Sequence, residues 1–507
     1  MNRPLQIISD KNLSPKQKTN LLAAEAENSL PYVSVSEKVT KALEENVLCD
    51  IFEGHAPYKP RYVLPDYAKF LSNGSKHLEL DPATNLDEAI NLLTILYHHV
   101  PSVTSIPVYI GQLDDILLPY IGELTEAQIY QKLKLFWIML DRTLPDAFMH
   151  ANIGPTDNVI CRTILKVDAE LKQIAPNLTF MYDPEVTPDD LLRQATSNIC
   201  ECSKPHIANY PMHSRTFDDK GFGIVSCYNS LPLAGGANTL VRMNLKEVAL
   251  RSDNAEHFLA DVLPEYCRIM FELIEARTAF LHEQSNFFGS FLVQEELIYE
   301  DKFAPMYGIY GMAEAVQILF EKQGQSFQYG RDAEAAKLSY KISETLAGIV
   351  ESTPVTYGLN GRALLHSQAG ISLDKEVTPG VRIPYGTEPD PVSYIKTTVK
   401  HHQYYPSGIS DILTIDETVK NNPEAMYNLC KGAIALGMRE FTANVNSNDL
   451  VRVTGYMVKL SDIAKFKDQG SRTNTTFLGS EAADNTGILD RQPRVISQEM
   501  SPTYDFG

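Results

Sequence analysis

The sequence predicts an α/β protein, and two observations carry this prediction. Long stretches with helical spacing of apolar residues alternate with short apolar runs that suit buried strands. Of the 507 residues, 44% are hydrophobic, which is ample for a large core. A chain of this length fits either several domains or one large barrel, and neither an internal repeat nor a low-complexity segment decides between them.

Charge and composition argue against several other classes of protein. The formal net charge is −19 at pH 7, whereas nucleic-acid binding proteins usually carry a basic face. No apolar run reaches the roughly eighteen residues of a membrane helix, and residues 1–18 lack the apolar stretch of a signal peptide. Seven cysteines in so long a chain do not suggest a disulfide framework, so we expect a cytoplasmic protein that binds neither nucleic acid nor membrane.

The N-terminal part is predicted to be mainly helical. Residues 1–30 suit a loose arm or short helices. Asn85 can cap the helix that follows it, because acidic residues occupy the first turn and leucines line one face. A short strand is expected at 177–182. The helices expected in this part cover residues 36–48, 86–99, 126–144 and 158–174, with a further helix running into residues 200–202.

Polar residues near the predicted loops are candidates for a substrate site. His150 and Asn152 belong to a loop bounded by prolines. His206 and His213 follow a Cys-x-Cys sequence at residues 200–202. That spacing fits no common zinc module, so we predict no metal site there and expect core or site-lining residues.

The C-terminal half repeats the alternation of helices and short strands. The Gly-rich stretch at 233–239 lacks the residues of a phosphate-binding loop and favours close backbone packing. His401 and His402 lie in a loop rich in tyrosine, and a strand is expected at 439–445. Helices are expected over residues 245–282, 310–322, 331–350 and 417–436.

Cys227 is the cysteine whose surroundings suit chemistry. It follows the apolar residues Phe222, Ile224 and Val225, which predict a buried strand that leads into a loop. A single cysteine is most often a small buried hydrophobic residue. A chemical role for Cys227 therefore depends on a partner elsewhere in the chain.

The partner is the sequence Arg-Val-Thr-Gly-Tyr at residues 452–456. Strand-like runs precede and follow it, so Gly455 first suggests the tip of a turn. The pentapeptide also resembles the loop of the glycyl radical enzymes, in which an Arg-Val-x-Gly-Tyr sequence carries a stable backbone radical. Such a radical is delocalised into both flanking amides and needs a locally planar Cα, which only glycine permits.

The resemblance implies a role for each of these residues. Gly455 would store the radical, and Arg452 and Tyr456 would support its loop. Cys227 would form a transient thiyl radical that abstracts hydrogen from a small polar substrate. The enzyme would be sensitive to oxygen and would bind no cofactor, because a separate radical S-adenosylmethionine iron–sulfur activase installs the radical.

The sequence is most similar to the YjjI branch of the glycyl radical enzymes, over nearly the whole chain. This resemblance implies a ten-stranded β/α barrel made of two five-stranded halves, with the Cys and Gly loops meeting inside, and a homodimer. The barrel domain would span residues 31–460, between an N-terminal arm (1–30) and a C-terminal tail (461–507). The stretches that carry the resemblance are residues 52–62, 200–209, 226–236 and 448–460.

The sequence leaves the reaction open. Ser226 stands where pyruvate formate-lyase-like enzymes have a second cysteine, and Asn229 stands where dehydratases have a glutamate base. The paired Cys-x-x-Cys motifs of anaerobic ribonucleotide reductases are absent from the sequence. Lyase, eliminase or reductase chemistry and a catalytically silent homologue, acting as a partner or a radical spare part, all stay open. The candidate substrate-site residues are His150, Asn152, His206, His213, Asn229, His401 and His402.

Overall fold

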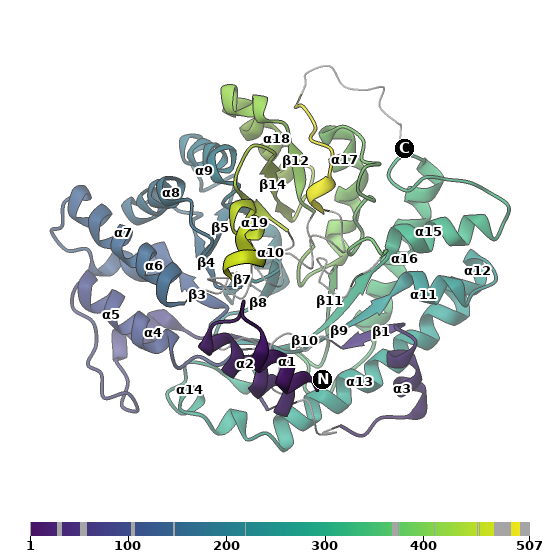
Figure 1. Cartoon of the computed structure of the whole chain (residues 1–507), viewed down its shortest axis with the longest axis horizontal. Helices are drawn as coiled ribbons and strands as arrows, with labels where there is room; N and C mark the ends of the chain where they lie inside the picture. The colour runs from purple at the N-terminus through teal and green to yellow at the C-terminus, as the bar shows by residue number, and fades with distance from the viewer. Residues whose placement is uncertain are drawn as a thin grey trace.

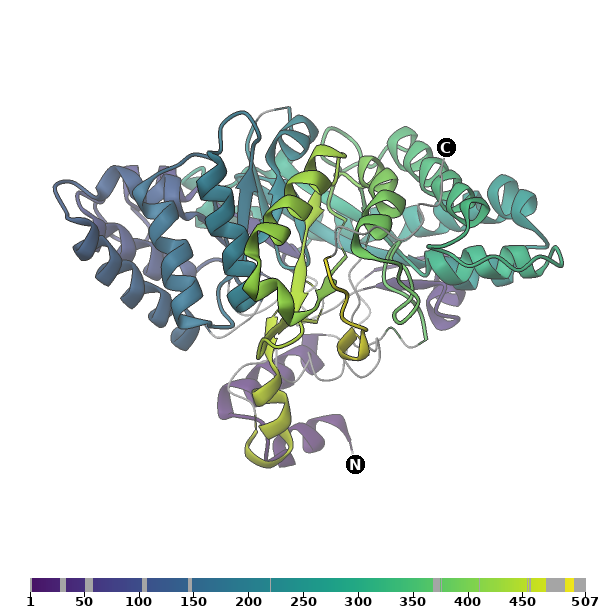
Figure 2. The same ribbon diagram turned by 90° about the horizontal axis from the view of Figure 1, so that it is seen from above.

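A computed structural model gives the arrangement of the chain. Figures 1 and 2 show central strands between two outer groups of helices, with N-terminal helices and α19 (Leu460–Gln469) at one side. The structure describes residues 2–27, 33–50, 58–102, 107–144, 148–218, 220–367, 374, 376–409, 411–453, 455, 457–470 and 488–496.

The first five-stranded sheet has four parallel strands and one antiparallel edge strand. Its order is β13, β6, β5, β4, β3, and β13 runs antiparallel to β6. Parallel strands are joined through helices, which cover one face of this sheet (Figure 1). The strands are β3 (Tyr109–Gln112), β4 (His150–Ile153), β5 (Asn177–Tyr182), β6 (His206–Asn209) and β13 (Glu440–Phe441). The covering helices are α7 (Glu126–Thr143), α8 (Val159–Leu171), α9 (Asp189–Cys202) and α18 (Pro423–Ala435).

Side chains alternate between the two faces of this first sheet. Leu178 and Phe180 belong to the main hydrophobic core, whereas Met181 belongs to a second, smaller cluster that includes Ala208 and Tyr228. Because side chains in a strand point alternately to opposite faces, the polar residues between the core positions lie on the side of the second cluster. We call this side the inner face, and its residues are His150, Asn152, Asn177, Thr179, Met181, His206 and Ala208.

The second five-stranded sheet is centred on β9. Strands β9, β10 and β11 are parallel, and β1 and β2 pair antiparallel with β9. The Gly-rich stretch predicted to pack closely begins β9: a Cβ on Gly236 would overlap Tyr62 O and lie 2.9 Å from the carbonyl carbon of Tyr62. The strands are β1 (Leu48–Asp50), β2 (Tyr62–Leu64), β9 (Gly235–Asn244), β10 (Phe303–Tyr310) and β11 (Leu364–Ser367). Helices α11 (Leu245–Leu250), α13 (Leu263–Glu283), α15 (Met312–Glu321) and α16 (Ala333–Ser352) lie beside it in Figure 1.

Three strand pairs complete the sheets among the described residues. They are β7 (Phe222–Val225) with β8 (Asn229–Pro232), β12 (Leu413–Ile415) with β14 (Ala443–Val445), and β15 (Leu450–Arg452) with β16 (Met457–Lys459). Within the described part of the chain, hydrogen bonds do not join the strands into one closed ring. The α/β class predicted from the sequence is confirmed.

The remaining helices are short or lie at the periphery. Within the described ranges, no helix combines the length and the apolar composition that crossing a bilayer requires. A Cβ on Gly470, just after α19, would lie 2.7 Å from Asn12 O, so the end of α19 contacts the turn between α1 and α2, and both views place α19 beside the N-terminal helices (Figures 1 and 2). The short or peripheral helices are α1 (Arg3–Ser9), α2 (Pro15–Glu27), α3 (Glu37–Glu44), α4 (Tyr67–Asn73), α5 (Leu86–Tyr97), α6 (Leu113–Leu117), α10 (Tyr210–Thr216), α12 (Ala255–His257), α14 (Phe291–Gln294) and α17 (Pro391–Thr398).

Residues 245–282, predicted to be largely helical, are helical with one interruption between α11 and α12. The helical conformation ends after α11. It begins again at α12, where Asn254 Oδ1 accepts a hydrogen bond from His257 N at 2.9 Å. Asn254 is thus the N-cap of α12, a position at which asparagine is one of the preferred residues. Pro264 follows the π-helical turn at Phe258–Val262, and its missing N–H interrupts the regular hydrogen-bond pattern of the helix there.

Arg491, in the C-terminal segment 488–496, is anchored in the core by buried carboxylates. Its Nε donates to Glu388 Oε1 at 2.5 Å, and Nη1 and Nη2 donate to the two Asp411 oxygens at 3.1 Å each. All three side chains are buried. Because a bidentate arginine in a buried carboxylate pair is held strongly, this contact fixes the segment at 488–496.

Candidate active site

The glycine loop lies between two paired strands. Strands β15 and β16 run antiparallel, as the strand-like runs around the pentapeptide predict. Gly455 lies between them and is buried. Residues 454 and 456 lie outside the described residues, so the supporting role of Tyr456 stays a prediction.

Cys227 lies at the tip of a second hairpin. Strands β7 and β8 are antiparallel and are joined by Ser226, Cys227 and Tyr228, all of them buried. Ser226 and Tyr228 have left-handed backbone conformations, with φ of +51° and +64°. Such a conformation costs a non-glycine residue about 1–2 kcal/mol, and it persists only where the surroundings hold it. Strained turns of this kind are typical of functional sites.

Hydrogen bonds to both strands, β7 and β8, hold the cysteine hairpin in place. Asn152 Nδ2 donates to Ile224 O, and Ile224 N donates to Asn152 Oδ1, each at 2.9 Å. On the other leg, Ser230 N donates to Ser407 O at 3.0 Å. Because both ends of the Asn152 amide are engaged by the backbone of β7, the structure places this residue as a support of the hairpin.

The two loops meet directly. A Cβ built on Gly455 would overlap the Cα of Cys227 and lie 2.6 Å from its Cβ and 2.7 Å from its N. Real side chains do not approach so closely, so only glycine fits at this position. The backbone of Gly455 therefore packs on Cys227 with no residue between them.

Arg452 holds the carbonyl of the glycine through Asn177. Asn177 Nδ2 donates to Gly455 O at 2.5 Å, and Arg452 Nη1 donates to Asn177 Oδ1 at 2.8 Å. Arg452 is fully buried, its Nε donates to Ser203 O at 3.1 Å, and its backbone exchanges two hydrogen bonds of 2.9 Å with Asn444. Within the described residues no carboxylate pairs with Arg452, so the dipoles of neutral groups surround its charge.

Two of the predicted histidines form a chain on the inner face. His150 Nε2 lies 2.5 Å from Thr179 Oγ1, which lies 3.0 Å from His206 Nδ1. The His206 ring packs edge-on against Tyr228, with 4.5 Å between ring centres. Burial lowers the pKa of both histidines well below the usual value, and the positive charge of Arg452 lowers each pKa further. Both are therefore neutral hydrogen-bonding groups beside the cysteine hairpin.

His213 and Asn229 also contact this hairpin. His213 lies on α10, and its Nδ1 is 2.9 Å from Ser230 Oγ of β8. Asn229 Nδ2 donates to Val225 O at 3.1 Å across the hairpin, which leaves Asn229 Oδ1 without a hydrogen-bond partner among the described residues. The structure thus brings five of the predicted residues to the cysteine hairpin: His150, Asn152, His206, His213 and Asn229.

His401 and His402 make their hydrogen bonds elsewhere. His401 Nδ1 lies 2.9 Å from Ser343 Oγ on α16, and His402 Nδ1 accepts from Arg439 N at 3.0 Å. Burial lowers the pKa of each to about 3. Their ring bonds join α16 to the chain before β13, so the structure gives them packing contacts and no bond to either hairpin among the described residues.

Three residues of the site were not predicted from the sequence. They are Asn177, Tyr228 and Glu440, which is fully buried on β13. Residues 177–182 held a usable signal, because parallel strands are usually apolar on both faces and this one alternates with polar residues. A glutamate inside an expected buried strand was a second such signal.

The structure contains no metal centre in its described part. No group of three or more His, Cys, Asp or Glu side chains there is arranged to hold a metal ion. Cys202 Sγ donates to Asn198 O at 3.3 Å within α9, and Cys200 is also buried. No disulfide joins any of the seven cysteines.

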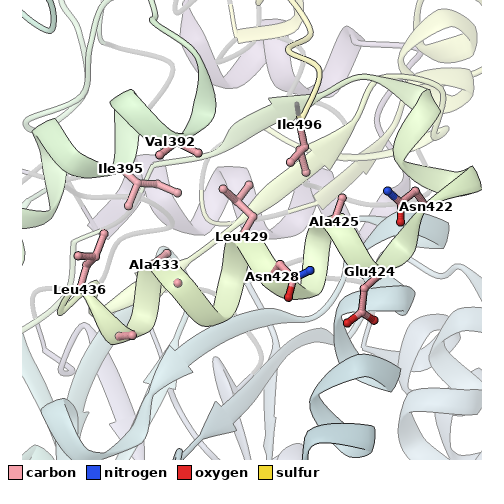
Figure 3. Close-up of a pocket in the computed structure, with 12 residues that line it drawn as sticks. Val392, Ile395, Asn422, Glu424, Ala425, Asn428, Leu429, Ala433, Leu436 and Ile496 are labelled. Atoms are coloured by element: carbon pink, nitrogen blue, oxygen red, sulfur yellow. The ribbon is translucent and has the colours of Figure 1, made fainter. Parts of the chain in front are cut away.

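A groove of about 630 Å³ lies outside this site, between α17 and α18. Figure 3 shows Leu429 and Ile496 pointing into it. Glu424 at its edge is paired with Arg193, with 3.0 Å between Oε2 and Nε. The lining contains neither histidine nor cysteine, and its residues are Val392, Ile395, Asn422, Glu424, Ala425, Asn428, Leu429, Gly432, Ala433, Ala435, Leu436 and Ile496.

Solved structures with a similar fold include a dehydratase and a ribonucleotide reductase. The hydroxyproline dehydratase of Clostridioides difficile is 13% identical, with a TM-score of 0.75 over 97% of this chain and 88% of that one. The anaerobic ribonucleotide reductase of Thermotoga maritima is 13% identical, with a TM-score of 0.67 over 92% of this chain and 91% of that one. At this identity the likeness establishes the α/β fold that these enzymes share.

Sequence relatives give the particular family. The family described as "Glycyl radical enzyme YjjI-like" matches residues 13–494. The uncharacterized protein YjjI of Escherichia coli (strain K12) is 62% identical over 500 residues, which is 98% of this chain and 97% of that protein. The chain belongs to the YjjI-like family of glycyl radical enzymes.

Proposed function

We propose that Gly455 stores the radical in this enzyme and that Cys227 passes it to a small polar substrate. One observation carries the proposal: the backbone of Gly455 packs on Cys227 so closely that an added Cβ would lie 2.6 Å from the Cβ of Cys227. A hydrogen atom can move between two residues only if they approach within contact distance. These two residues, 228 positions apart (455 − 227 = 228), meet that condition.

Hydrogen atoms move in five balanced steps. The activase first removes a hydrogen atom from the Cα of Gly455. The glycine radical then takes a hydrogen atom from the Cys227 thiol, which becomes a thiyl radical. The thiyl takes a hydrogen atom from a substrate carbon, and the substrate radical reacts. The thiol returns a hydrogen atom to the product radical, and Gly455 returns one to the sulfur.

The surroundings of both residues support this sequence of steps. A glycine radical shares its unpaired electron with the carbonyl, so the hydrogen bond of 2.5 Å from Asn177 stabilises the delocalised form. Cys227 is buried, with an exposed fraction of 5%, which keeps water and reductants away from the thiyl. The Ser226 hydroxyl lies 3.8 Å from Cys227 Sγ, at the position where a second cysteine would stand in pyruvate formate-lyase-like enzymes.

The substrate we propose is a small polar molecule that binds at the inner face. Neutral His150 and His206, with Thr179 between them, supply hydrogen-bonding groups there. Solved relatives include a dehydratase with trans-4-hydroxy-L-proline and a ribonucleotide reductase with dATP and CTP. Asn229 cannot act as the base that a glutamate provides, so we leave lyase, eliminase and reductase chemistry as the candidate classes.

Finer features of fold and assembly belong to the same proposal. We take the two five-stranded sheets as halves of a ten-stranded barrel around the two hairpins. A homodimer in the cytoplasm, with a radical S-adenosylmethionine activase as its transient partner, follows from the family. The seven cysteines, none in a disulfide, are in keeping with a reducing compartment.

Electron paramagnetic resonance tests the glycine radical. Anaerobic protein is activated with its matched activase, and wild type should give a doublet from the one hydrogen left on the Gly455 Cα. The Gly455→Ala variant should give none. Exposure of the activated wild type to air should then cleave the chain at Gly455, which mass spectrometry detects.

Deuterated solvent tests the step to Cys227 without any substrate. The thiol exchanges its hydrogen with D₂O, so reversible transfer to Gly455 should replace the glycine hydrogen and collapse the doublet. The Cys227→Ser variant should keep the doublet in D₂O. A doublet that survives in wild type would show that the two residues do not exchange hydrogen, and no doublet with a matched activase would favour a silent homologue.

A further inference from the structure

Glu440 is a buried carboxyl group without a hydrogen-bond partner. Its exposed fraction is 0%, and within the described residues neither carboxyl oxygen accepts or donates a hydrogen bond. The neighbouring Arg439 directs its guanidinium group elsewhere, to His402 O and Thr216 Oγ1, both at 3.2 Å. Native proteins rarely leave a buried carboxyl group unsatisfied, so this one calls for a ligand or a chemical role.

The register of β13 directs Glu440 to the inner face. Glu440 is opposite Ala208 in the antiparallel pair with β6, and opposite residues share a face of the sheet. Ala208 belongs to the cluster that contains Tyr228, next to Cys227. Phe441, the next residue, faces the main core with Ile207.

His213 lies between Glu440 and the cysteine hairpin. Its Nδ1 is 2.9 Å from Ser230 Oγ and 3.5 Å from Arg439 Nη1, and its Nε2 is 3.5 Å from Glu440 Oε1. Arginine can only donate, so Nδ1 is the acceptor and the neutral ring carries its hydrogen on Nε2, toward Glu440. At 3.5 Å this contact orients the carboxyl group and leaves both oxygens available.

The ionisation state of Glu440 follows from its surroundings. Burial raises its pKa well above the usual value, and the charge of Arg439 offsets only part of this effect. The groups that face it from other elements are neutral: His213 from α10, Ala208 from β6 and Tyr228 from the cysteine hairpin. A raised pKa favours the protonated carboxylic acid, whose O–H can donate.

We propose that Glu440 is a catalytic residue, backed by His213, whose carboxyl group donates a hydrogen bond to an alcohol or carbonyl oxygen of the substrate. Glu440 would thus supply an acidic group that binds the substrate oxygen. The amide of Asn229 cannot act as such an acid. His213 is a positioning residue, because it reaches the substrate only through Glu440. This assignment rests on the proposed radical function and names the substrate class as uncharged, oxygen-bearing small molecules.

The experiment compares Glu440→Gln and Glu440→Leu with wild type and with the control Asp114→Asn. Asp114 is a second buried carboxyl group, whose pKa burial raises to about 7, but Gly154 N and Asn158 Nδ2 already donate to it. Activation with electron paramagnetic resonance comes first, and all four proteins should give the doublet. A missing doublet in wild type would overturn the radical function, independently of Glu440.

Infrared spectra and probe binding then test Glu440 itself. The C=O band of a protonated carboxyl group should be lost in both Glu440 variants, with the fold checked by circular dichroism. Ethane-1,2-diol and hydroxyacetone are the probes, followed by saturation-transfer NMR. Binding should weaken about tenfold in Glu440→Leu, stay within about threefold in Glu440→Gln, which still donates, and stay unchanged in the Asp114 control.

Three results would overturn the assignment. The first is the same carboxyl band in wild type and Glu440→Gln, which would mean that Glu440 is ionised. The second is equal probe binding by wild type and Glu440→Leu. The third is the absence of binding of both probes to wild type, which would contradict the substrate class.

Discussion

Replacing Gly455 by alanine separates two consequences of the glycine, one in packing and one in chemistry. The new Cβ would overlap Cys227 Cα, and the atoms it meets are backbone atoms of a strained turn, which cannot rotate away. Overpacking of a buried site costs about 1–3 kcal/mol, and we expect the upper end here, about 3 kcal/mol. Guanidinium unfolding of the anaerobic protein, before activation, measures this loss.

Gly348→Ala is the matched control for this substitution. Gly348 lies in α16, and a Cβ there would meet nothing within 4 Å. The same added methyl group should therefore stabilise the helix by about 0.5–1 kcal/mol and leave the radical doublet intact. Equal stabilities of wild type and Gly455→Ala would refute the close contact with Cys227, whatever the spectrum of the activated protein shows.

Three further substitutions probe one support of the site and two buried contacts outside it. Asn177→Ala leaves Gly455 O unsatisfied, so unfolding should cost about 2 kcal/mol less and the doublet should decay faster under nitrogen; an unchanged lifetime would contradict the stabilising hydrogen bond. His401 has a pKa of about 3 in the folded state, so the unfolded chain binds more protons below pH 6.5 and stability falls as pH falls. His401→Gln should flatten that loss by about 1.4 kcal/mol per pH unit between pH 6 and pH 4, and an unaltered slope in urea titrations would exclude His401 as its source. Arg491→Ala strands Glu388 without its cation, and should lower the free energy of unfolding by about 3 kcal/mol; Arg491→Lys should restore part of it, and a fully stable alanine variant would count against a buried ion pair.

The sequence predicted what depends on local pattern. The strand before Cys227, the strand-like runs on both sides of Gly455 and the close packing at the start of β9 all follow from short runs of residues, and the structure confirms them. The interruption between α11 and α12 could not be located from the sequence, because helical spacing of apolar residues continues across it while the cap at Asn254 starts a new helix.

The site residues that were missed depend on contacts between distant parts of the chain. Asn177 meets the glycine loop only because β5 lies beside it in the fold, and Glu440 joins His213 only through the pairing of β13 with β6. Likewise, His401 and His402 were candidates as acid–base groups in a tyrosine-rich loop, and only the fold shows that the ring of His401 contacts Ser343 of α16. Sequence spacing carries no information about such pairings.

The close approach of the two hairpins has a consequence for the evolution of the family. Packing alone disfavours any other residue at 455, so a lineage that abandoned radical chemistry would still tend to retain this glycine. The sulfur of Cys227 is under no such steric obligation, and drift would replace it by another small group once selection on chemistry ceased. Among relatives, position 227 is thus the one that distinguishes active enzymes from homologues that have lost catalytic activity.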